Sequence, residues 1–148
     1  MKFLLSTVAQ SLADYLSGFP EFAGVTFYQD PTQQQDVPCM FLQQRHSEIK
    51  ESIGGRVLRT IMLDLTYLVD YNLPNMQQLY QNAADALDLF LATFPYMDGD
   101  KMTLLRTYNR EWDIDLDALH YKFELRVWQQ QTDGFNPMVT LEYFPEVL

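Results

Sequence analysis

Residues 36–71 carry the feature that most constrains the fold: two long arms of alternating residues on either side of an adjacent pair of glycines. In the second arm nearly every other residue is apolar, which is the period of a β-strand with one buried face. Gly54 and Gly55 can adopt the positive φ angles of a tight turn. The segment therefore predicts one unusually long antiparallel hairpin, with Cys39 at its base and a charged tip.

The two faces of the second arm differ in polarity. The apolar face holds Val57, Ile61, Leu63, Leu65, Tyr67, Val69 and Tyr71. The other face holds Arg56, Thr60, Asp64, Thr66 and Asp70, interrupted by Leu58, Met62 and Leu68. These interruptions indicate that the more polar face is also partly covered. In the first arm, Phe41 is the clearest apolar anchor after Cys39.

Two segments show the three- and four-residue apolar spacing of amphipathic helices. The first spans residues 2–17 and stops before Pro20. The second spans residues 72–95, where Pro74 suits the first turn and Pro95 is expected to end the helix.

Shorter β-rich runs complete the organisation. Residues 24–29 predict a short strand, and residues 102–114 and 118–130 predict a second hairpin. In the first arm of this hairpin, one side is expected to hold Leu104, Tyr108, Trp112 and Ile114. In the second arm, one side is expected to hold Leu119, Tyr121, Phe123, Leu125 and Val127, and the other His120, Lys122, Glu124 and Arg126.

The predicted fold class is α+β: an antiparallel sheet built from the long hairpin and the second hairpin, with two helices packed on one face. Residues 1–131 are expected to form a single domain. Residues 132–148 are rich in aromatic residues and lack a firm period, so they predict an extended C-terminal arm, with one short strand at residues 139–143.

The charge balance excludes some partners. The formal net charge is −10, with a sequence pI of about 4.4. Binding to DNA, RNA or anionic membranes needs a basic surface, so this chain is not expected to bind any of the three. An acidic surface can still line a passage through which DNA slides without sticking.

The cysteine content and the apolar runs indicate the cellular compartment. A single cysteine excludes an intramolecular disulfide, and Cys39 in an apolar context is expected to be a buried small hydrophobe. The apolar run after Lys2 is too short for a signal peptide, and no stretch reaches the length of a membrane span. The sequence therefore predicts a soluble cytoplasmic protein.

The sequence shows no assembled chemistry. It contains no Gly-rich phosphate loop, and its two histidines, His46 and His120, fall on different predicted strands. The acidic alternation at residues 113–120 lacks the glycine and final glutamate of a calcium loop, so a solvated turn is favoured. No enzymatic activity, cofactor or metal site is expected.

The surface is the unusual property. The chain holds 9 Tyr and 10 Phe, more than a small monomer of this kind is expected to bury, and aromatic-rich sheets are typical of subunit interfaces. The hairpin tip gathers charges that are candidates for an interface with a neighbouring copy: Glu48, Lys50, Glu51, Arg56 and Arg59. A solvated tip with ordinary cross-strand pairs explains the same residues equally well.

Several of these segments together resemble the tail terminator proteins of tailed phages and prophages. The resemblance covers residues 1–94 and is carried by a loose match at residues 27–30 and by two strands. In those strands, the matching positions are Pro38, Cys39, Phe41, Arg59, Leu63, Asp64, Leu65 and Tyr67. Pro38, Cys39, Phe41, Asp64 and Tyr67 are the residues expected to be structural in the family motif.

The resemblance implies a function in the virion. It implies a ring, typically of six subunits, that caps the tail tube, stops its polymerisation and joins it to the head connector. DNA would pass through an acidic lumen without specific binding. Such a protein would be assembled in the bacterial cytoplasm and sit at the head-proximal end of the tail.

Two other classes remain open. One is an acidic protein-binding module, such as an inhibitor that mimics the charge of DNA, which would be a monomer with carboxylates on one convex face. The other is a small hydrolase, which would need His46 or His120 to meet an aspartate in a pocket.

Overall fold

The structure, a computed structural model, describes residues 3–28, 36–70, 72–115 and 117–130. Its helices and strands are α1 (Leu5–Ser17), β1 (Thr26–Tyr28), β2 (Cys39–Glu51), β3 (Arg56–Leu68), α2 (Met76–Phe90), β4 (Thr93–Asp98), β5 (Lys101–Asp115) and β6 (Ala118–Gln130). The predicted α+β class is confirmed. The predicted arm at residues 132–148, with its strand at residues 139–143, lies outside the described residues.

The strands form one curled sheet in the order β1-β2-β3-β6-β5-β4. The expectation of a purely antiparallel sheet is wrong at one edge, because β1 pairs with β2 in parallel. The Thr26 N–H donates to the Pro38 carbonyl at 3.0 Å, just before β2 begins. Alternation within such a short strand reports which face is buried and carries no information on strand direction, so the pairing could not be read from it.

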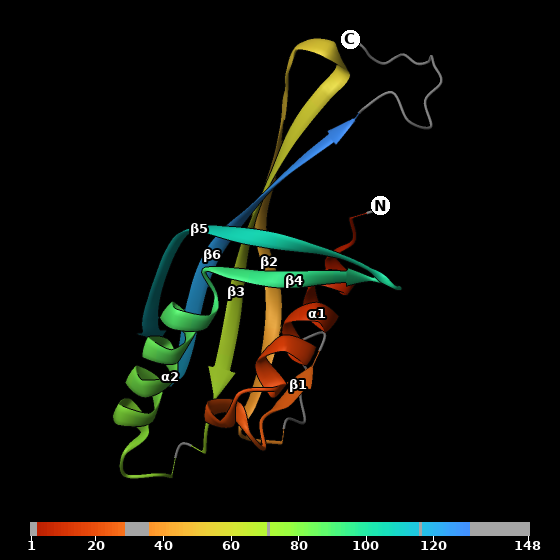
Figure 1. Cartoon of the computed structure of the whole chain (residues 1–148). Coiled ribbons are helices and arrows are strands. Elements are labelled where there is room, and N and C mark those ends of the chain that lie inside the picture. Colours follow the sequence, from red (N-terminus) through yellow and green to blue (C-terminus); the bar gives the residue numbers. More distant parts are fainter. Residues whose placement is uncertain (1–2, 29–35, 71, 116, 131–148) are drawn as a thin grey trace.

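The long hairpin is confirmed. β2 and β3 pair over their whole lengths, and the chain turns at Ile53–Gly55, where Gly54 has a φ of 84°. On the side away from β2, β3 also pairs with β6 from Arg56 to Tyr67. Figure 1 shows β2, β3 and β6 rising together out of the body, while β4 and the start of β5 run across them. The predicted two-arm hairpin is thus part of a three-stranded ribbon.

A bulge in β2 changes which residues face the core. Gln44 lies opposite Leu63 but His46 opposite Met62, so one extra residue interrupts the alternation at Arg45. Before the bulge, the core side chains are Met40 and Leu42. Cys39 and Phe41 are buried, but on the other face of the sheet, which corrects the expectation that they anchor the hairpin to the core.

The second helix is shorter than predicted. α2 ends at Phe90, and the residues expected to complete it form β4, in which Pro95 lies opposite Leu104 of β5. Phe94 is fully buried, so its apolar character fits a strand as well as a helix stripe. Pro95 can be accommodated because β4 is the edge strand of the sheet.

One hydrophobic core joins both helices and the sheet. From the helices it includes Val8, Leu12, Leu16, Tyr80, Ala84 and Leu87. From the two central strands it includes Ile61, Leu63, Leu65, Leu119, Tyr121, Phe123 and Leu125, as the alternation predicted. Phe19 stacks on Phe90 at 3.8 Å between ring centroids, which ties the ends of the helices together.

The predicted face of β5 is wrong. Leu104 is 63% exposed and Trp112 36% exposed. β5 pairs with β4 as far as Arg106 and with β6 from Thr107, and an extra residue follows Tyr108. A strand that changes partners and bulges does not keep one face buried along its length.

No helix in the described part of the chain is long and apolar enough to cross a membrane.

Candidate assembly surface and polar pocket

The five charged residues predicted for a subunit interface lie at the end of the ribbon, but on both of its faces. Residues alternate between faces along a strand. Glu48, Lys50 and Arg56 share one face, and Glu51 and Arg59 lie on the face that continues from the core. The tip therefore does not present the five residues as one cluster.

Charges do not face one another directly across the arms. Glu48 lies opposite Thr60, and Lys50 lies opposite Leu58. A directly opposed ion pair, which would stabilise the hairpin by a few tenths of a kcal/mol to about 1 kcal/mol, is therefore not formed at these two positions.

The arginines of the tip contact aromatic rings. The Arg56 guanidinium lies 4.4 Å from the centre of the Trp128 ring, and that of Arg59 lies 5.8 Å from the Phe3 ring. Such contacts hold a cation over the electron-rich face of the ring. Sequence reasoning missed Trp128, although an indole on the polar side of a strand was the available signal.

The ribbon also exposes apolar side chains. Ile53 is 95% exposed, Ile49 is 65% exposed and Trp128 is 52% exposed. Single exposed apolar residues are normal on a protein surface, but three near one projecting tip are typical of a contact surface.

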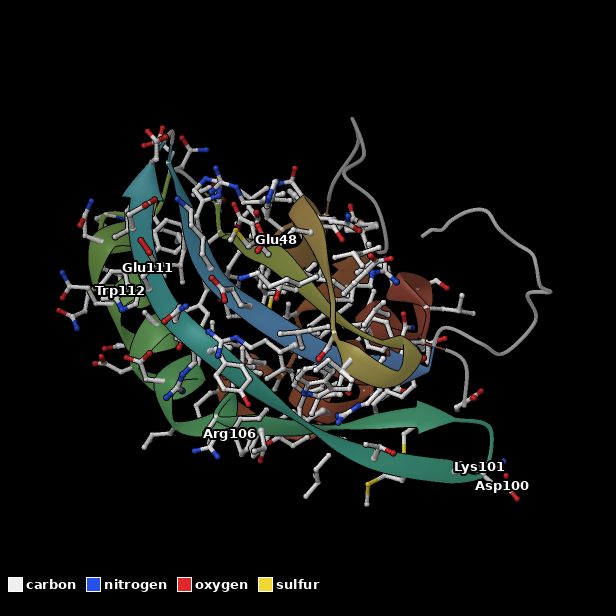
Figure 2. All side chains as sticks on the ribbon, turned by 90° about the horizontal axis from the view of Figure 1, so that it is seen from above. Glu48, Asp100, Lys101, Arg106, Glu111 and Trp112 are labelled. Carbon is white, nitrogen blue, oxygen red and sulfur yellow. The ribbon has the colours of Figure 1, made fainter. Side chains whose placement is uncertain are left out.

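A second exposed apolar surface lies on the β4–β5 hairpin. Met97 lies opposite Met102, and Pro95 opposite Leu104, so these side chains share one face of the hairpin. Both methionines and Leu104 are exposed. Figure 2 shows this hairpin extending from Arg106 near its base to Asp100 and Lys101 at its tip. It was not predicted, because β4 was assigned to the helix.

A polar pocket of about 600 Å³ lies between β2, β3, β6 and the end of β5. Asp64 lies at its base with only 5% exposure, and its carboxylate is 2.9 Å from His120 Nδ1. The Thr66 hydroxyl donates to the other carboxylate oxygen at 3.1 Å. Gln43 Nε2 donates to the Thr66 hydroxyl at 3.2 Å, which completes a buried polar chain.

The rim of this pocket is charged and more exposed. Lys122 Nζ lies 3.1 Å from a carboxylate oxygen of Asp113, whose side chain is 52% exposed. Arg45 and Asp115 also line the opening. The lining holds both cationic and anionic groups, so the pocket does not favour a ligand of one charge.

The pocket meets one condition of the hydrolase hypothesis and lacks another. His120 does converge with an aspartate, whereas His46 lies elsewhere on the ribbon, 3.7 Å from Glu48. No serine or cysteine lies among the residues that line the pocket, and the Thr66 hydroxyl already donates to Asp64. The Thr66 hydroxyl also lies 3.5 Å from His120 Nδ1, but that ring nitrogen is closer to Asp64, at 2.9 Å, so among the described residues no hydroxyl or thiol is arranged as a nucleophile with His120 as its base.

The part of the chain that the structure describes has no site for metal binding or thiol chemistry either. In the described ranges, no three His, Cys, Asp or Glu side chains come close enough to hold a metal ion. Cys39 is fully buried, and burial raises the pKa of its thiol, with a further increase from the Asp36 carboxylate. A buried neutral thiol is a poor nucleophile.

The predicted family-motif residues surround the base of the ribbon. Tyr67 packs edge-on against Phe22 and Tyr80, with centroids 6.4 and 5.8 Å apart, and burial raises the pKa of its hydroxyl. Pro38 precedes β2 and accepts from β1, Cys39 and Phe41 are buried, and Asp64 lies under the pocket. That these positions are structural stays a prediction, in keeping with the burial of Cys39, Phe41, Asp64 and Tyr67.

A comparison with protein families finds one relevant match. The model of a family described as phage tail terminator protein matches residues 4–134. None of the curated proteins matches the chain. The matched segment contains every element of the fold described above, including the ribbon and the second hairpin.

Proposed function

This chain belongs to the phage tail terminator family, and from that premise we propose that it closes into a ring, typically of six subunits, on the end of the tail tube. The family match indicates a structural role in the phage tail. The ring would stop polymerisation of the tube and join it to the head connector. Assembly would take place in the bacterial cytoplasm, before the finished tail joins the head.

The observation that carries the ring is the exposed ribbon. A three-stranded projection with Ile49, Ile53 and Trp128 on its surface leaves apolar area uncovered that a second subunit can bury. A contact between two different surfaces of the same subunit repeats around an axis and closes into a ring when the rotation permits. The charged residues at the tip, Glu48, Lys50, Glu51, Arg56 and Arg59, would then set the register between neighbours.

The charge of the chain fits the passage of DNA. A net charge of −10 gives a ring of several copies a strongly negative surface. DNA that moves through such a ring is repelled by its wall and does not adhere to it. In this proposal, residues 1–131 form the ring-building domain, and residues 132–148 form an arm.

The test is the native mass of the purified protein by light scattering, alone and mixed with the tail-tube protein of the same phage. We expect a closed ring in at least one of these two samples, and capped tube ends by electron microscopy. Ile53→Ser should shift the ring toward monomer, whereas Leu89→Ser should not, since Leu89 is also exposed (79%) but lies on α2. A monomer in both samples, with tubes left uncapped, would contradict the proposal and favour the acidic binding module.

A further inference from the structure

Both edges of the ribbon are open in the described part of the chain. β1 pairs with β2 only at Cys39–Phe41, so no described strand pairs with residues 42–50 on their outer side. β5 pairs with β6 as far as Leu125, so residues 126–130 have none on theirs. In Figure 1 the upper part of the ribbon, above the crossing of β5, stands clear of the helices and of β4.

An open edge is a template for another strand. Every second residue of an edge strand directs its backbone N–H and C=O away from the sheet. The Ser52 N–H donates to the Arg56 carbonyl at 2.8 Å. By the alternation of an antiparallel ladder, the backbone groups of Ile49 therefore point outward.

We infer that the β6 edge of one copy pairs with the β2 edge of the next copy, so that the ribbons form one continuous sheet around the ring. The inference rests on the proposed ring and specifies which surfaces build it. β2 and β6 both run antiparallel to β3, so they point in the same direction, toward the tip. Neighbours related by rotation about an axis along the ribbon would therefore pair these strands in parallel.

The side chains on the two edges are complementary if the pairing between copies continues the register found within one chain. Within one chain, residues that lie side by side across β2, β3 and β6 form level rows: Glu48–Thr60–Arg126, Ile49–Arg59–Val127 and Lys50–Leu58–Trp128. Carrying these rows into the next copy puts Arg126 beside Glu48, Val127 beside Ile49 and Trp128 beside Lys50. The first row joins opposite charges, the second joins apolar side chains, and the third places a cation beside an indole.

Pairing β6 of one copy with β2 of the next accounts for both open edges with one repeated contact. A twofold pairing of β2 with β2 would also place Glu48 beside Lys50, but it would leave the edge of β6 and the exposed Trp128 uncovered. Such an isologous contact forms dimers and does not close into a ring by itself.

A disulfide trap separates these arrangements. In the chain carrying both Ile49→Cys and Val127→Cys, the Cα atoms of the two cysteines lie on either side of β3, about 10 Å apart. That separation exceeds the roughly 7 Å limit for a disulfide within one chain. Cys39 is fully buried, so the wild-type chain serves as the uncross-linked control.

Under mild oxidation, we expect the double variant to give a ladder of covalent oligomers up to the size of the ring. Each single variant should give no ladder. Dimers from Ile49→Cys alone would show the twofold contact and overturn the inference. An assembled ring in which the double variant gives no ladder would overturn it as well, while leaving the proposed function in place. Absence of any assembly, with or without tube protein, would overturn both.

A second pair of variants tests whether the backbone makes the contact. Ile49→Pro removes an outward N–H, which an edge strand tolerates in the monomer. Ile49→Ala keeps that N–H and removes the apolar side chain. We expect the proline variant to lose the ring and the alanine variant to keep it, with far-ultraviolet circular dichroism showing that both remain folded. Equal assembly by the two variants would contradict pairing through the backbone.

Discussion

Replacement of Asp64 by alanine should destabilise the fold by about 2–3 kcal/mol. The Asp64 side chain is 8% exposed and has two partners: its carboxylate accepts from the Thr66 hydroxyl at 3.1 Å and lies 2.9 Å from His120 Nδ1. Removing it leaves both partners without that contact. The cost of a buried group that loses its partner exceeds the net gain from an ordinary hydrogen bond.

The magnitude follows from the burial of each partner. Thr66 is 2% exposed, so water cannot easily replace the lost acceptor. Its hydroxyl keeps the hydrogen bond from Gln43 and lies 3.5 Å from His120 Nδ1, but it loses its bond to a charged acceptor, which is worth about 1.5–3 kcal/mol. The His120 side chain is 22% exposed, so water can satisfy part of its hydrogen-bonding capacity. Its loss therefore adds less, about 1 kcal/mol or below.

Asp113 provides a matched control in the same pocket. It has a comparable partner, Lys122, at 3.1 Å, but its side chain is 52% exposed. An exposed pair of this kind contributes about 0–1 kcal/mol, so Asp113→Ala should change stability little. Both substitutions remove one negative charge and the same atoms, and they differ mainly in burial.

Urea denaturation of the three proteins at pH 7 and 25 °C measures the difference. One protein concentration must be used throughout, because self-association adds to the apparent stability. The expected order is wild type and Asp113→Ala close together, with Asp64→Ala well below both. Equal losses for the two variants, or a loss below about 0.5 kcal/mol for Asp64→Ala, would refute the reasoning from burial.

Two further expectations concern buried tyrosines. The Tyr80 hydroxyl accepts from the Val69 N–H at 3.1 Å and donates to the Asp117 carbonyl at 2.7 Å, so Tyr80→Phe should lower the free energy of unfolding by about 1–3 kcal/mol; an unchanged urea midpoint would contradict this. Burial, followed by the hydrogen bond to Asp88, raises the pKa of Tyr121, so the unfolded chain ionises this hydroxyl before the folded chain does. Stability should therefore fall as the pH rises above about 10. Tyr121→Phe should lessen that fall, and denaturation profiles as steep as those of the wild type would count against this cause.

The backbone contacts and the side-chain contacts of the proposed interface place different demands on the sequence. Open backbone edges need only extended chain that no neighbour covers, and many sequences meet that condition. The side chains at the level rows add selectivity, because Glu48 beside Arg126 penalises a shift that would bring like charges together. The tip of the ribbon therefore combines a general means of pairing with a specific register.

Local pattern determined the elements that bury one face along their whole length. The alternation in β3 and β6 identified Ile61, Leu63, Leu119 and Tyr121 as core residues, because a period of two puts all of them on one side of a strand. The apolar spacing of both helices and the glycine turn at Gly54 were equally readable. These signals depend only on neighbours in sequence.

Tertiary structure decided the features that depend on which strands meet. The bulge at Arg45, the change of partner along β5 and the parallel entry of β1 have no local period, so alternation predicted the wrong face or direction there. Asp64 and His120 are 56 positions apart, and only the pairing of β3 with β6 brings them together. The same pairing extends the hairpin into a three-stranded ribbon whose open edges lie on strands far apart in sequence. Sequence patterning reports burial one strand at a time, whereas edges and pockets are properties of the assembled sheet.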